Sequence, residues 1–288
     1  MKIITGISEM QATAETLRTS GKRIGFVPTM GFLHDGHLSL LHEAKKHADV
    51  TVMSIFVNPT QFAPNEDFED YPRDFERDVA LAQSAGCDII FYPDQKDIYP
   101  DPYLTYVTVE KITTVLCGAS RPTHFRGVTT IVAKLFNIVK PHVAVFGQKD
   151  AQQAIVIQRM TKDLNFDVQI IVAPIVREPD GLAMSSRNTY LLPHQRQQAV
   201  VLYRSLQLAQ KMIADGERNA TVIQQAMRKL IEQQPDAHVD YIELVDTTNL
   251  QPVERLSGEV LIALAVKIGK PRLIDNIIVN IDDGRNES

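Results

Sequence analysis

The sequence predicts an α/β fold, with a parallel-sheet domain followed by a smaller α+β domain. Over the first ~175 residues, short apolar runs rich in β-branched side chains alternate with helical patterns, which is typical of βαβ units. After Pro179-Asp180-Gly181 the pattern changes to polar-amphipathic helices followed by three alternating strands. We therefore expect two domains, residues 1–176 and residues 177–288.

The strands predicted for the first domain are short and apolar throughout, as expected where helices cover both faces of a parallel sheet. They are Ile24–Val27, Val50–Val57, Asp88–Tyr92, Val143–Phe146 and Val168–Ile175. Helical patterns lie between them, at Leu38–His47, Phe75–Ser84, Gly127–Val139 and Gln152–Leu164. The order of strands and helices favours parallel crossovers over hairpins.

The second domain is predicted to begin with helices. One long helix is expected over Pro193–Ala214, because proline suits the first helical turn and Asp215-Gly216 ends the pattern. A second helix is expected over Ala220–Gln233. Three alternating strands follow, at Val239–Val245, Val260–Ile268 and Arg272–Val279, with a hairpin-like break at Gly269-Lys270-Pro271 between the last two.

Composition excludes several classes of protein. The 288 residues are 44% hydrophobic and 23% charged, which is ordinary for a globular protein, and the net charge of −5 argues against a broad nucleic-acid-binding face. No apolar run approaches the ~20 residues that span a bilayer, and residues 1–6 lack an apolar signal core. The two cysteines, Cys87 and Cys117, do not make a disulfide framework. We expect a cytoplasmic protein without nucleic-acid or membrane partners.

The most informative run is Pro28 to His37, which reads P-T-M-G-F-L-H-D-G-H. It joins a predicted strand to a predicted helix and places His34, Gly36 and His37 at the junction. Unpaired backbone N–H groups at a helix start attract anions, and two imidazoles at the same place add hydrogen-bond donors. The run therefore favours a phosphate site over a turn with two surface histidines.

A second cluster, Phe146-Gly147-Gln148-Lys149-Asp150, ends one predicted strand and begins the next helix, where open α/β sheets bind ligands. Gly147 permits close backbone approach, Lys149 supplies a charge for phosphate, and Asp150 can accept from ribose hydroxyls or cap the helix. An ordinary helix start with a solvated lysine has the same sequence. The sequence contains neither a Walker loop nor G-x-G-x-x-G.

Two further sets contain polar side chains suited to a ligand. Met184-Ser185-Ser186-Arg187 can wrap a triphosphate with hydroxyls and a guanidinium, although a polar linker has similar composition. Asn58 and Gln61 follow a strand, and Gln153 lies one turn beyond Lys149. These amides suit the hydroxyls and carboxylate of a small substrate, and exposed surface amides are the alternative.

Three possibilities stay open for Gly118–Gly127, which contains two arginines and a histidine: an anion-facing loop, a support for the segment Phe62–Arg73, or a subunit contact. The segment Phe62–Arg73 is longer than a tight connection needs and is expected to be a mobile flap. No Cys/His/Asp array has the spacing of a metal cage, so we expect Mg²⁺ to arrive with the nucleotide.

Together these motifs resemble the pantoate–β-alanine ligases, also called pantothenate synthetases, a family of the HxGH nucleotidyltransferase superfamily. The resemblance covers nearly the whole chain and is specific at family level. The matching motifs, in chain order, are Val27–Gly31 with His34–His37, Ser54–Pro59 with Gln61-Phe62, Tyr71–Arg73, Gly118–Pro122 with His124–Gly127, Phe146–Asp150 with Gln152-Gln153, Met184–Asn188 and Arg272–Asn276. Gln148 stands where the family often has glutamate, and we expect little consequence from this.

The resemblance implies a Rossmann-like first domain that binds nucleotide and pantoate, a C-terminal lid and a homodimer. It implies ATP-dependent joining of pantoate and β-alanine through a pantoyl adenylate, with AMP and pyrophosphate released. The implied phosphate ligands are His34, His37, Lys149, Ser185, Ser186 and Arg187. Of these, His37 is the proton donor, and His34, Lys149 and Arg187 are also catalytic. The other implied ATP contacts are Met30, Gly31, Gly36, Gly147, Gln148, Asp150, Val176 and Met184, and the pantoate contacts are Asn58, Gln61 and Gln153.

Two other functions remain as alternatives. Another HxGH nucleotidyltransferase would transfer a nucleotide to a phosphorylated acceptor and release no free AMP. The Gln61 and Gln153 pair argues against that acceptor, because amides add no positive charge. A non-catalytic ATP-binding module would bind ATP without releasing pyrophosphate for any acid.

Overall fold

The computed structural model describes residues 1–64 and 66–281, which divide into two compact units. The first unit contains residues 1–114, 118–148 and 153–174. The second contains residues 175 onward together with two short segments from earlier in the chain, Val115–Cys117 and Lys149–Gln152. Each unit has its own sheet and its own apolar core.

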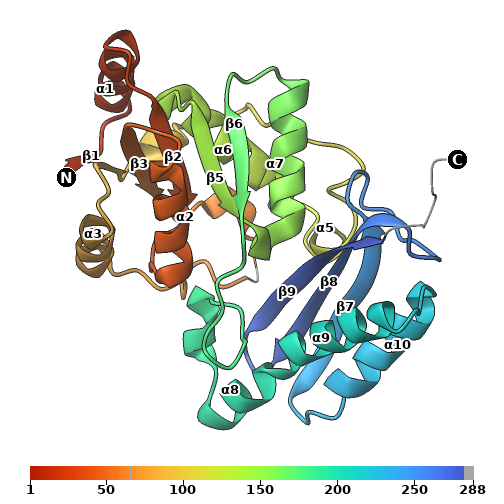
Figure 1. Cartoon of the computed structure of the whole chain (residues 1–288). Helices are drawn as coiled ribbons and strands as arrows, with labels where there is room; N and C mark the ends of the chain where they lie inside the picture. The colour runs from red at the N-terminus through yellow and green to blue at the C-terminus, as the bar shows by residue number, and fades with distance from the viewer. Residues whose placement is uncertain (65, 282–288) are drawn as a thin grey trace, which may run out of the picture. The chain divides into compact units, whose positions relative to one another are not determined.

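The first unit is built on a six-stranded sheet in which every pair of neighbouring strands is parallel (Figure 1). The strand order is β1-β4-β3-β2-β5-β6. The strands are β1 (Lys2–Ile4), β2 (Ile24–Thr29), β3 (Val50–Ile55), β4 (Ile89–Phe91), β5 (Val143–Gly147) and β6 (Gln169–Ala173). The parallel, Rossmann-like α/β class predicted from the sequence is confirmed.

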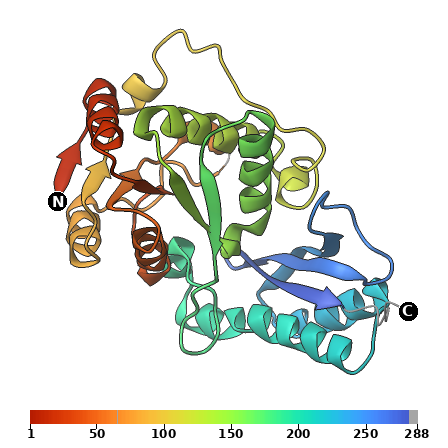
Figure 2. The same ribbon diagram turned by 45° about the horizontal axis from the view of Figure 1, so that its top comes forward.

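Helices cover both faces of this sheet (Figures 1 and 2). The α-helices that begin within the first unit are α1 (Ile7–Thr19), α2 (Asp35–Lys45), α3 (Phe75–Ser84), α4 (Gln95–Ile98) and α6 (His124–Val139). Two more, α5 (Cys117–Ser120) and α7 (Ala151–Asp163), begin in the short segments assigned to the second unit. Short 3-10 turns lie at η1 (Pro59–Gln61) and η2 (Gln148–Asp150).

Side chains along the central strands β2 and β3 alternate between two apolar clusters. Phe26 and Val52 belong to the cluster that includes residues of α1, α6 and α7, whereas the adjacent Val27 and Met53 belong to the cluster with α2. A strand that is buried on both faces needs apolar residues at every position. This requirement explains why the strands were visible in the sequence as continuous apolar runs.

Several features of the first unit differ from the sequence prediction. The short strand β1 was not predicted, because of its three residues only Ile4 is buried. The helix α1 was also missed, because its sequence is mostly polar and only Met10 and Ala14 are buried. Finally, α6 begins at His124, three residues before the predicted start at Gly127.

The second unit is an antiparallel sheet of three strands in the order β7-β8-β9. The strands are β7 (Ala237–Asp246), β8 (Gly258–Ile268) and β9 (Arg272–Ile281). Their apolar residues share a core with residues of α9 (Val201–Ala214) and α10 (Ala220–Ile231). The smaller α+β arrangement predicted from the sequence is therefore confirmed.

The single long helix predicted over Pro193–Ala214 is wrong. The structure has two helices, α8 (Pro193–Ala199) and α9, separated at Val200. The separation falls at two consecutive β-branched residues, Val200 and Val201, which lose side-chain freedom in a helical turn. Their apolar character still fits the helical pattern, so the pattern alone did not reveal the break.

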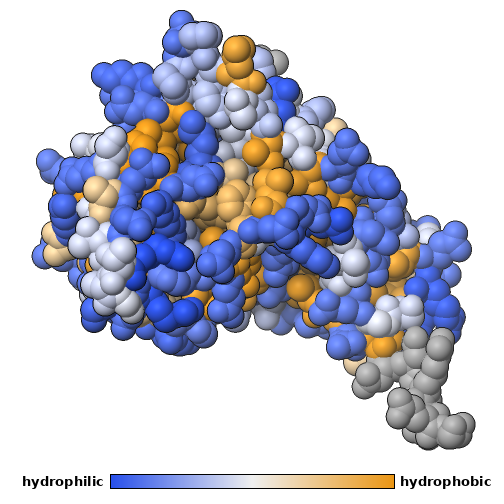
Figure 3. Space-filling view, turned by 90° about the horizontal axis from the view of Figure 1, so that it is seen from above, coloured by the Kyte–Doolittle hydropathy of each residue, from blue (hydrophilic) through white to orange (hydrophobic). Residues whose placement is uncertain are grey.

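On the face drawn in Figure 3, hydrophilic residues cover most of the surface, and apolar residues lie exposed between them. Single exposed apolar side chains are normal for folded proteins. Among residues 1–64 and 66–281, no helix is both long and apolar enough to cross a membrane.

Candidate active site

The loop between β2 and α2 is held by Asp78, a buried residue of α3. Its carboxylate accepts hydrogen bonds from the backbone N–H groups of Phe32 and Leu33, each at 2.7 Å. Burial raises the pKa of Asp78 above its usual value, although both bonds act in the opposite direction. Gly31 adopts φ +86°, and a Cβ atom there would lie 2.9 Å from Oδ2 of Asp78. Gly31 and Asp78 thus fix the path of the chain toward His34.

His34 and His37 form a reciprocal cap at the start of α2. Nδ1 of His34 accepts from the backbone N–H of Gly36 at 3.1 Å, and Nδ1 of His37 accepts from the backbone N–H of His34 at 3.3 Å. The ring centroids are 4.1 Å apart. A neutral imidazole whose Nδ1 accepts must carry its hydrogen on Nε2. Both rings therefore present an Nε2–H donor at a helix start, which suits a phosphate group.

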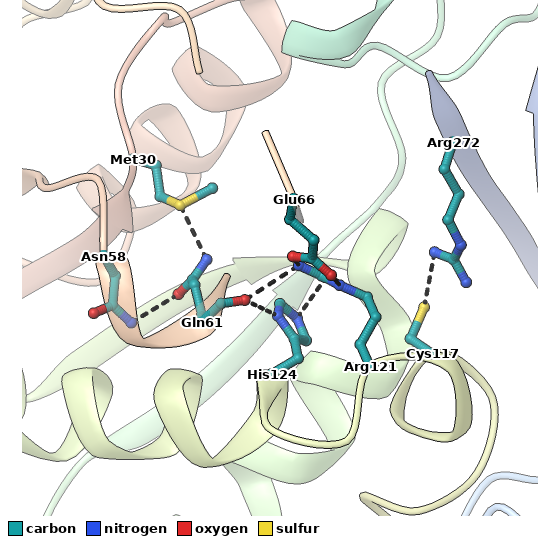
Figure 4. Close-up of polar contacts among 8 residues, drawn as sticks. All are labelled: Met30, Asn58, Gln61, Glu66, Cys117, Arg121, His124 and Arg272. Atoms are coloured by element: carbon teal, nitrogen blue, oxygen red, sulfur yellow. Dashed lines mark hydrogen bonds and ion pairs between the residues drawn. The ribbon is translucent and has the colours of Figure 1, made fainter. Parts of the chain in front are cut away.

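Gln61 lies between Met30 and Asn58, as Figure 4 shows. Its side-chain N–H group lies 2.9 Å from Sδ of Met30, and its carbonyl oxygen accepts from the Asn58 amide at 3.0 Å. Met30 follows β2, whereas Asn58 and Gln61 follow β3, so these residues meet at the carboxyl ends of adjacent strands. The structure thus brings Met30, which the resemblance assigns to ATP, next to Asn58 and Gln61, which it assigns to pantoate.

Asn58 is 1% exposed and is held on every side. Its carbonyl accepts from the hydroxyl of Tyr99 at 2.7 Å and from that of Thr60 at 2.9 Å, while its amide also donates to the carbonyl of Gly127 at 3.2 Å. Buried polar groups that are fully paired order their surroundings. Asn58 therefore fixes the position of Gln61.

The segment Gly118–Gly127 contacts Glu66 of the flap, in agreement with one of the three possibilities left open by the sequence. The Arg121 guanidinium pairs with the Glu66 carboxylate through two nitrogens and also donates to the carbonyl of Gln61 at 3.2 Å (Figure 4). His124 lies against the same carbonyl, with Nδ1 at 2.8 Å. Partial burial raises the pKa of Glu66, but the hydrogen bond and charge of Arg121 outweigh it and lower the pKa overall.

The carboxyl end of β5 carries the second cluster. Gly147 ends the strand, and the turn Gln148–Asp150 leads directly into α7, where Gln153 is half-buried. A Cβ atom on Gly147 would meet only Leu40 of α2, at an ordinary contact distance of 3.8 Å. Among the described residues, packing therefore does not require glycine here. Nζ of Lys149 lies 3.5 Å from the Asp150 carboxylate.

The third cluster follows a turn in the second unit. The backbone N–H of Met184 donates to the carbonyl of Val176 at 3.0 Å, and Arg177 forms an isolated bridge with Ala183. Ser185 then caps the short helix η3 (Ser186–Tyr190), because its hydroxyl accepts from the backbone N–H of Arg187 at 3.3 Å. The serine–arginine segment is thus an ordered helix start and not a plain linker.

The candidate residues belong to both units. The first unit contains Met30, Gly31, His34, Gly36, His37, Asn58, Gln61, Gly147, Gln148 and Gln153, and the second contains Lys149, Asp150, Val176, Met184, Ser185, Ser186 and Arg187. Within residues 1–64 and 66–281, no group of three or more His, Cys, Asp and Glu residues could hold a metal ion.

The supporting residues Asp78, Tyr99 and Thr60 were missed in the sequence. Asp78 carried the one usable signal, because it falls on the face of α3 that also buries Ala82. A carboxylate at a buried helix position indicates a specific partner. Tyr99 and Thr60 carried no such signal, since their contacts to Asn58 depend on the tertiary fold.

Comparison with known proteins gives one consistent family. Residues 2–278 match the family model described as pantoate-beta-alanine ligase. The pantothenate synthetase of Acetivibrio thermocellus is 57% identical over 281 residues, which cover 98% of this chain and 100% of the relative. That of Geobacter sulfurreducens is 56% identical over 279 residues, covering 97% of this chain and 99% of the relative.

Solved structures agree with this result. The crystal structure of pantothenate synthetase from Thermus thermophilus superposes with a TM-score of 0.91 at 41% identity, covering 96% of this chain and 99% of the other. Pantoate-beta-alanine ligase from Francisella tularensis, crystallised as a complex with beta-gamma ATP and β-alanine, superposes with a TM-score of 0.78 at 36% identity. That alignment covers 96% of this chain and 97% of the other.

Proposed function

The chain belongs to the pantoate-beta-alanine ligase family, and we infer that it catalyses the ATP-dependent condensation of pantoate with β-alanine. The products are pantothenate, AMP and pyrophosphate, and the intermediate is a pantoyl adenylate. The observation that carries this conclusion is the family match over residues 2–278. The beta-gamma ATP and β-alanine in the complex of the Francisella tularensis relative correspond to two of the three substrates proposed here.

The first step activates the acid. A pantoate carboxylate oxygen attacks the α-phosphorus of ATP, and the bond between that phosphorus and the bridging oxygen of pyrophosphate breaks. Negative charge builds up on the α-phosphate and the leaving pyrophosphate, so catalysis depends on positioning and on charge stabilisation. Hydrogen-bond donors and cations around the triphosphate are therefore expected to provide most of the rate enhancement in this step.

The second step forms the amide. The nitrogen of β-alanine attacks the acyl carbon, the bond from that carbon to the AMP oxygen breaks, and the nitrogen loses a proton as the amide forms. A free carboxylate would have to expel oxide, whereas the adenylate expels AMP, which is a far better leaving group. One oxygen of pantoate therefore leaves in AMP.

We assign the phosphates to the residues that the family resemblance implies. His34 and His37 contribute Nε2–H donors at the start of α2, which the reciprocal cap supports. Lys149 and Arg187 add positive charge, and Ser185 and Ser186 add hydroxyl donors. His34, His37, Lys149 and Arg187 are the residues proposed to be catalytic, because they stabilise charge that develops during pyrophosphate release.

The remaining nucleotide contacts are those that the family resemblance implies. Asp150 and Gly147 would contact the ribose, and the backbone of Met30 and Val176 would face the nucleotide. Gly31, Gly36, Gln148 and Met184 complete the set proposed for ATP. Among the described residues, no packing contact requires glycine at position 147. This supports close approach of a ligand there.

Pantoate is assigned to Gln61 and Gln153, whose amides suit its hydroxyls and carboxylate. Met30 and Phe62 would pack against its gem-dimethyl group. Asn58, assigned to pantoate from the sequence, has its amide and carbonyl engaged within the protein, so we propose that it acts by holding Gln61.

Further proposals concern the flap, the metal ion and the whole enzyme. The flap Phe62–Arg73 would exclude water from the mixed anhydride. Mg²⁺ would arrive with ATP, held mainly by phosphate oxygens and water, and would neutralise phosphate charge. The enzyme would be a cytoplasmic homodimer, in which residues 177–288 form a lid over the nucleotide.

One experiment tests the proposed function. Protein, ATP and Mg²⁺ are mixed with pantoate, and β-alanine is added later. We expect pyrophosphate release that depends on pantoate, followed by AMP and pantothenate in equal amounts after β-alanine is added. A nucleotide-linked product without AMP would indicate another nucleotidyltransferase, and ATP binding without pyrophosphate release would indicate a non-catalytic module.

A further inference from the structure

The start of β9 carries three polar side chains, Arg272, Asp275 and Asn276, whose roles the two reaction steps do not explain. Asp275 is 2% exposed and Asn276 is 3% exposed. Burying such groups is unfavourable unless they are hydrogen-bonded. Their partners therefore indicate what the sequence Arg272-Leu273-Ile274-Asp275-Asn276 does.

Asn276 holds the backbone of Lys149. Its side-chain amide donates to the Lys149 carbonyl at 3.0 Å, and its own backbone N–H donates to the Asp275 carboxylate at 2.8 Å. Lys149 is assigned to the phosphates, and its side chain starts from the backbone unit that Asn276 fixes. A change at Asn276 is therefore expected to shift the backbone unit from which the lysine ammonium extends.

Asp275 holds the turn that leads to the serine–arginine segment. It lies on the same strand face as Leu273 and Ile277, which pack in the apolar core of the second unit. Its carboxylate receives two bonds from the Arg177 guanidinium, at 2.6 and 2.9 Å. Burial raises the pKa of Asp275, and the pairing with Arg177 offsets this only in part.

Arg177 extends this link into the turn. It donates to the carbonyl of Gly181 at 3.0 Å and lies over the ring of Tyr203, with its Cζ atom 4.1 Å from the centroid. Gly181 adopts φ +98°, and a Cβ atom there would lie 2.2 Å from the Tyr203 ring. The turn from Val176 to Met184 is therefore fixed by a carboxylate on β9.

Arg272 holds a third segment. It donates to the Asp240 carboxylate at 2.9 and 2.7 Å and to Sγ of Cys117 at 3.5 Å (Figure 4). The backbone N–H of Cys117 in turn donates to the side chain of Gln152 at 2.9 Å. The two short segments that join the second unit, Val115–Cys117 and Lys149–Gln152, are thus tied to each other and to β9.

We propose that Asp275 and Asn276 are positioning residues for ATP: Asn276 sets the backbone of Lys149, and Asp275 sets the Val176–Met184 turn through Arg177. The inference rests on the proposed function, in which Lys149 and the segment Met184–Arg187 bind the nucleotide. Because the two residues point to opposite faces of one strand, β9 fixes two separate parts of the nucleotide site.

The test for Asn276 compares Asn276→Ala with Asn280→Ala, which removes an exposed asparagine from the same strand. We expect Asn276→Ala to raise KM for ATP about tenfold, equivalent to the loss of one positioning hydrogen bond. KM for pantoate should remain that of the control, and the variant should stay folded at the assay temperature. Asn276→Asp keeps the shape but replaces the donor by a carboxylate, and it should show the same raised KM for ATP.

The test for Asp275 uses Asp275→Asn and amide hydrogen exchange. We expect faster exchange over residues 177–187 than in the wild type, while exchange in β7 and β8 stays the same, together with weaker binding of a non-hydrolysable ATP analogue. A lower unfolding midpoint with unchanged affinity for that analogue would mean that Asp275 only stabilises the fold, and would overturn its part of the proposal.

The proposed function and the proposed role of Asn276 can be disproved independently of each other. If the wild type releases no pyrophosphate with pantoate, the proposed function fails. If the wild type is active and folded Asn276→Ala has the KM for ATP of Asn280→Ala, the proposal about Asn276 fails and the function stands.

Discussion

At the scale of single residues, the strongest claim concerns the imidazole of His37. The reciprocal cap uses Nδ1 of both histidines and leaves Nε2–H as the donor on each ring. Because these donors are fixed before the reaction begins, we propose that they stabilise the departing pyrophosphate without reorganising. The proposed phosphate contacts thus depend on the Nε2 atom of each ring and not only on the presence of two histidines.

We predict that His37→Ala lowers the rate of pantoate-dependent pyrophosphate release by about 10²–10³-fold, the usual loss for one preorganised donor. The matched control is His42→Ala, an exposed histidine on the same helix, which should keep the wild-type rate. Single-turnover pyrophosphate release measures both variants. A near-normal rate for His37→Ala would show that the ring does not contact the phosphates.

A second prediction at this scale separates the two substrates. Gln153→Ala should weaken pantoate binding by about tenfold or more, as expected when a hydrogen bond to a polar substrate is lost, and leave ATP binding unchanged. Gln158→Ala, at an exposed position of α7, is the control. Isothermal titration with each ligand provides the measurement, and equal losses for both ligands would contradict the assignment.

At the scale of elements, the proposed site depends on the contacts that hold its loops in place. We predict that Asp78→Asn disorders the loop before α2, because an amide accepts one of the two backbone N–H groups and places its own N–H against the other. The expected cost is about 1–3 kcal/mol in the free energy of unfolding, with a lower rate of pyrophosphate release. Glu76→Gln, exposed on the same helix, should change neither quantity. If both variants matched the wild type, Asp78 would not organise the loop.

The flap gives a second prediction at this scale. Glu66→Gln should weaken the pairing with Arg121 and let water reach the adenylate, so that more AMP is released than pantothenate is formed. Glu69→Gln, exposed in the same flap, should keep the two products equal. Equal products in Glu66→Gln would contradict the role of this ion pair in excluding water.

The same pair should respond to pH. The folded chain lowers the pKa of Glu66, so the ion pair stabilises the flap above the ordinary value of 4.5 and is lost as the pH falls below it. We therefore expect proteolysis of residues 62–73 to be faster in Glu66→Gln than in the wild type at pH 7. The difference should disappear at pH values well below 4.5, and a difference that persists there would rule out the ionised pair as its cause.

At the scale of the whole molecule, the sequence predicted the arrangement of helices and strands more completely than it predicted the residues that hold the candidate site in place. Strands buried on both faces must be apolar at each position, so the parallel sheet was visible in the sequence. The strand β1 and the helix α1 were not predicted, because they bury few residues. The motifs at His34, Gly147 and Ser185 follow from short-range chemistry, whereas the contacts of Asp78, Tyr99 and Asp275 join residues far apart in the chain.

Activation of pantoate as an acyl adenylate is tested most directly by following one oxygen atom of its carboxylate. Pantoate labelled with ¹⁸O in its carboxylate is converted with ATP, Mg²⁺ and β-alanine, and the released AMP is analysed by mass spectrometry. Attack of the carboxylate on the α-phosphorus predicts that AMP carries one labelled oxygen from pantoate. Unlabelled AMP, formed together with pantothenate, would contradict activation through an acyl adenylate.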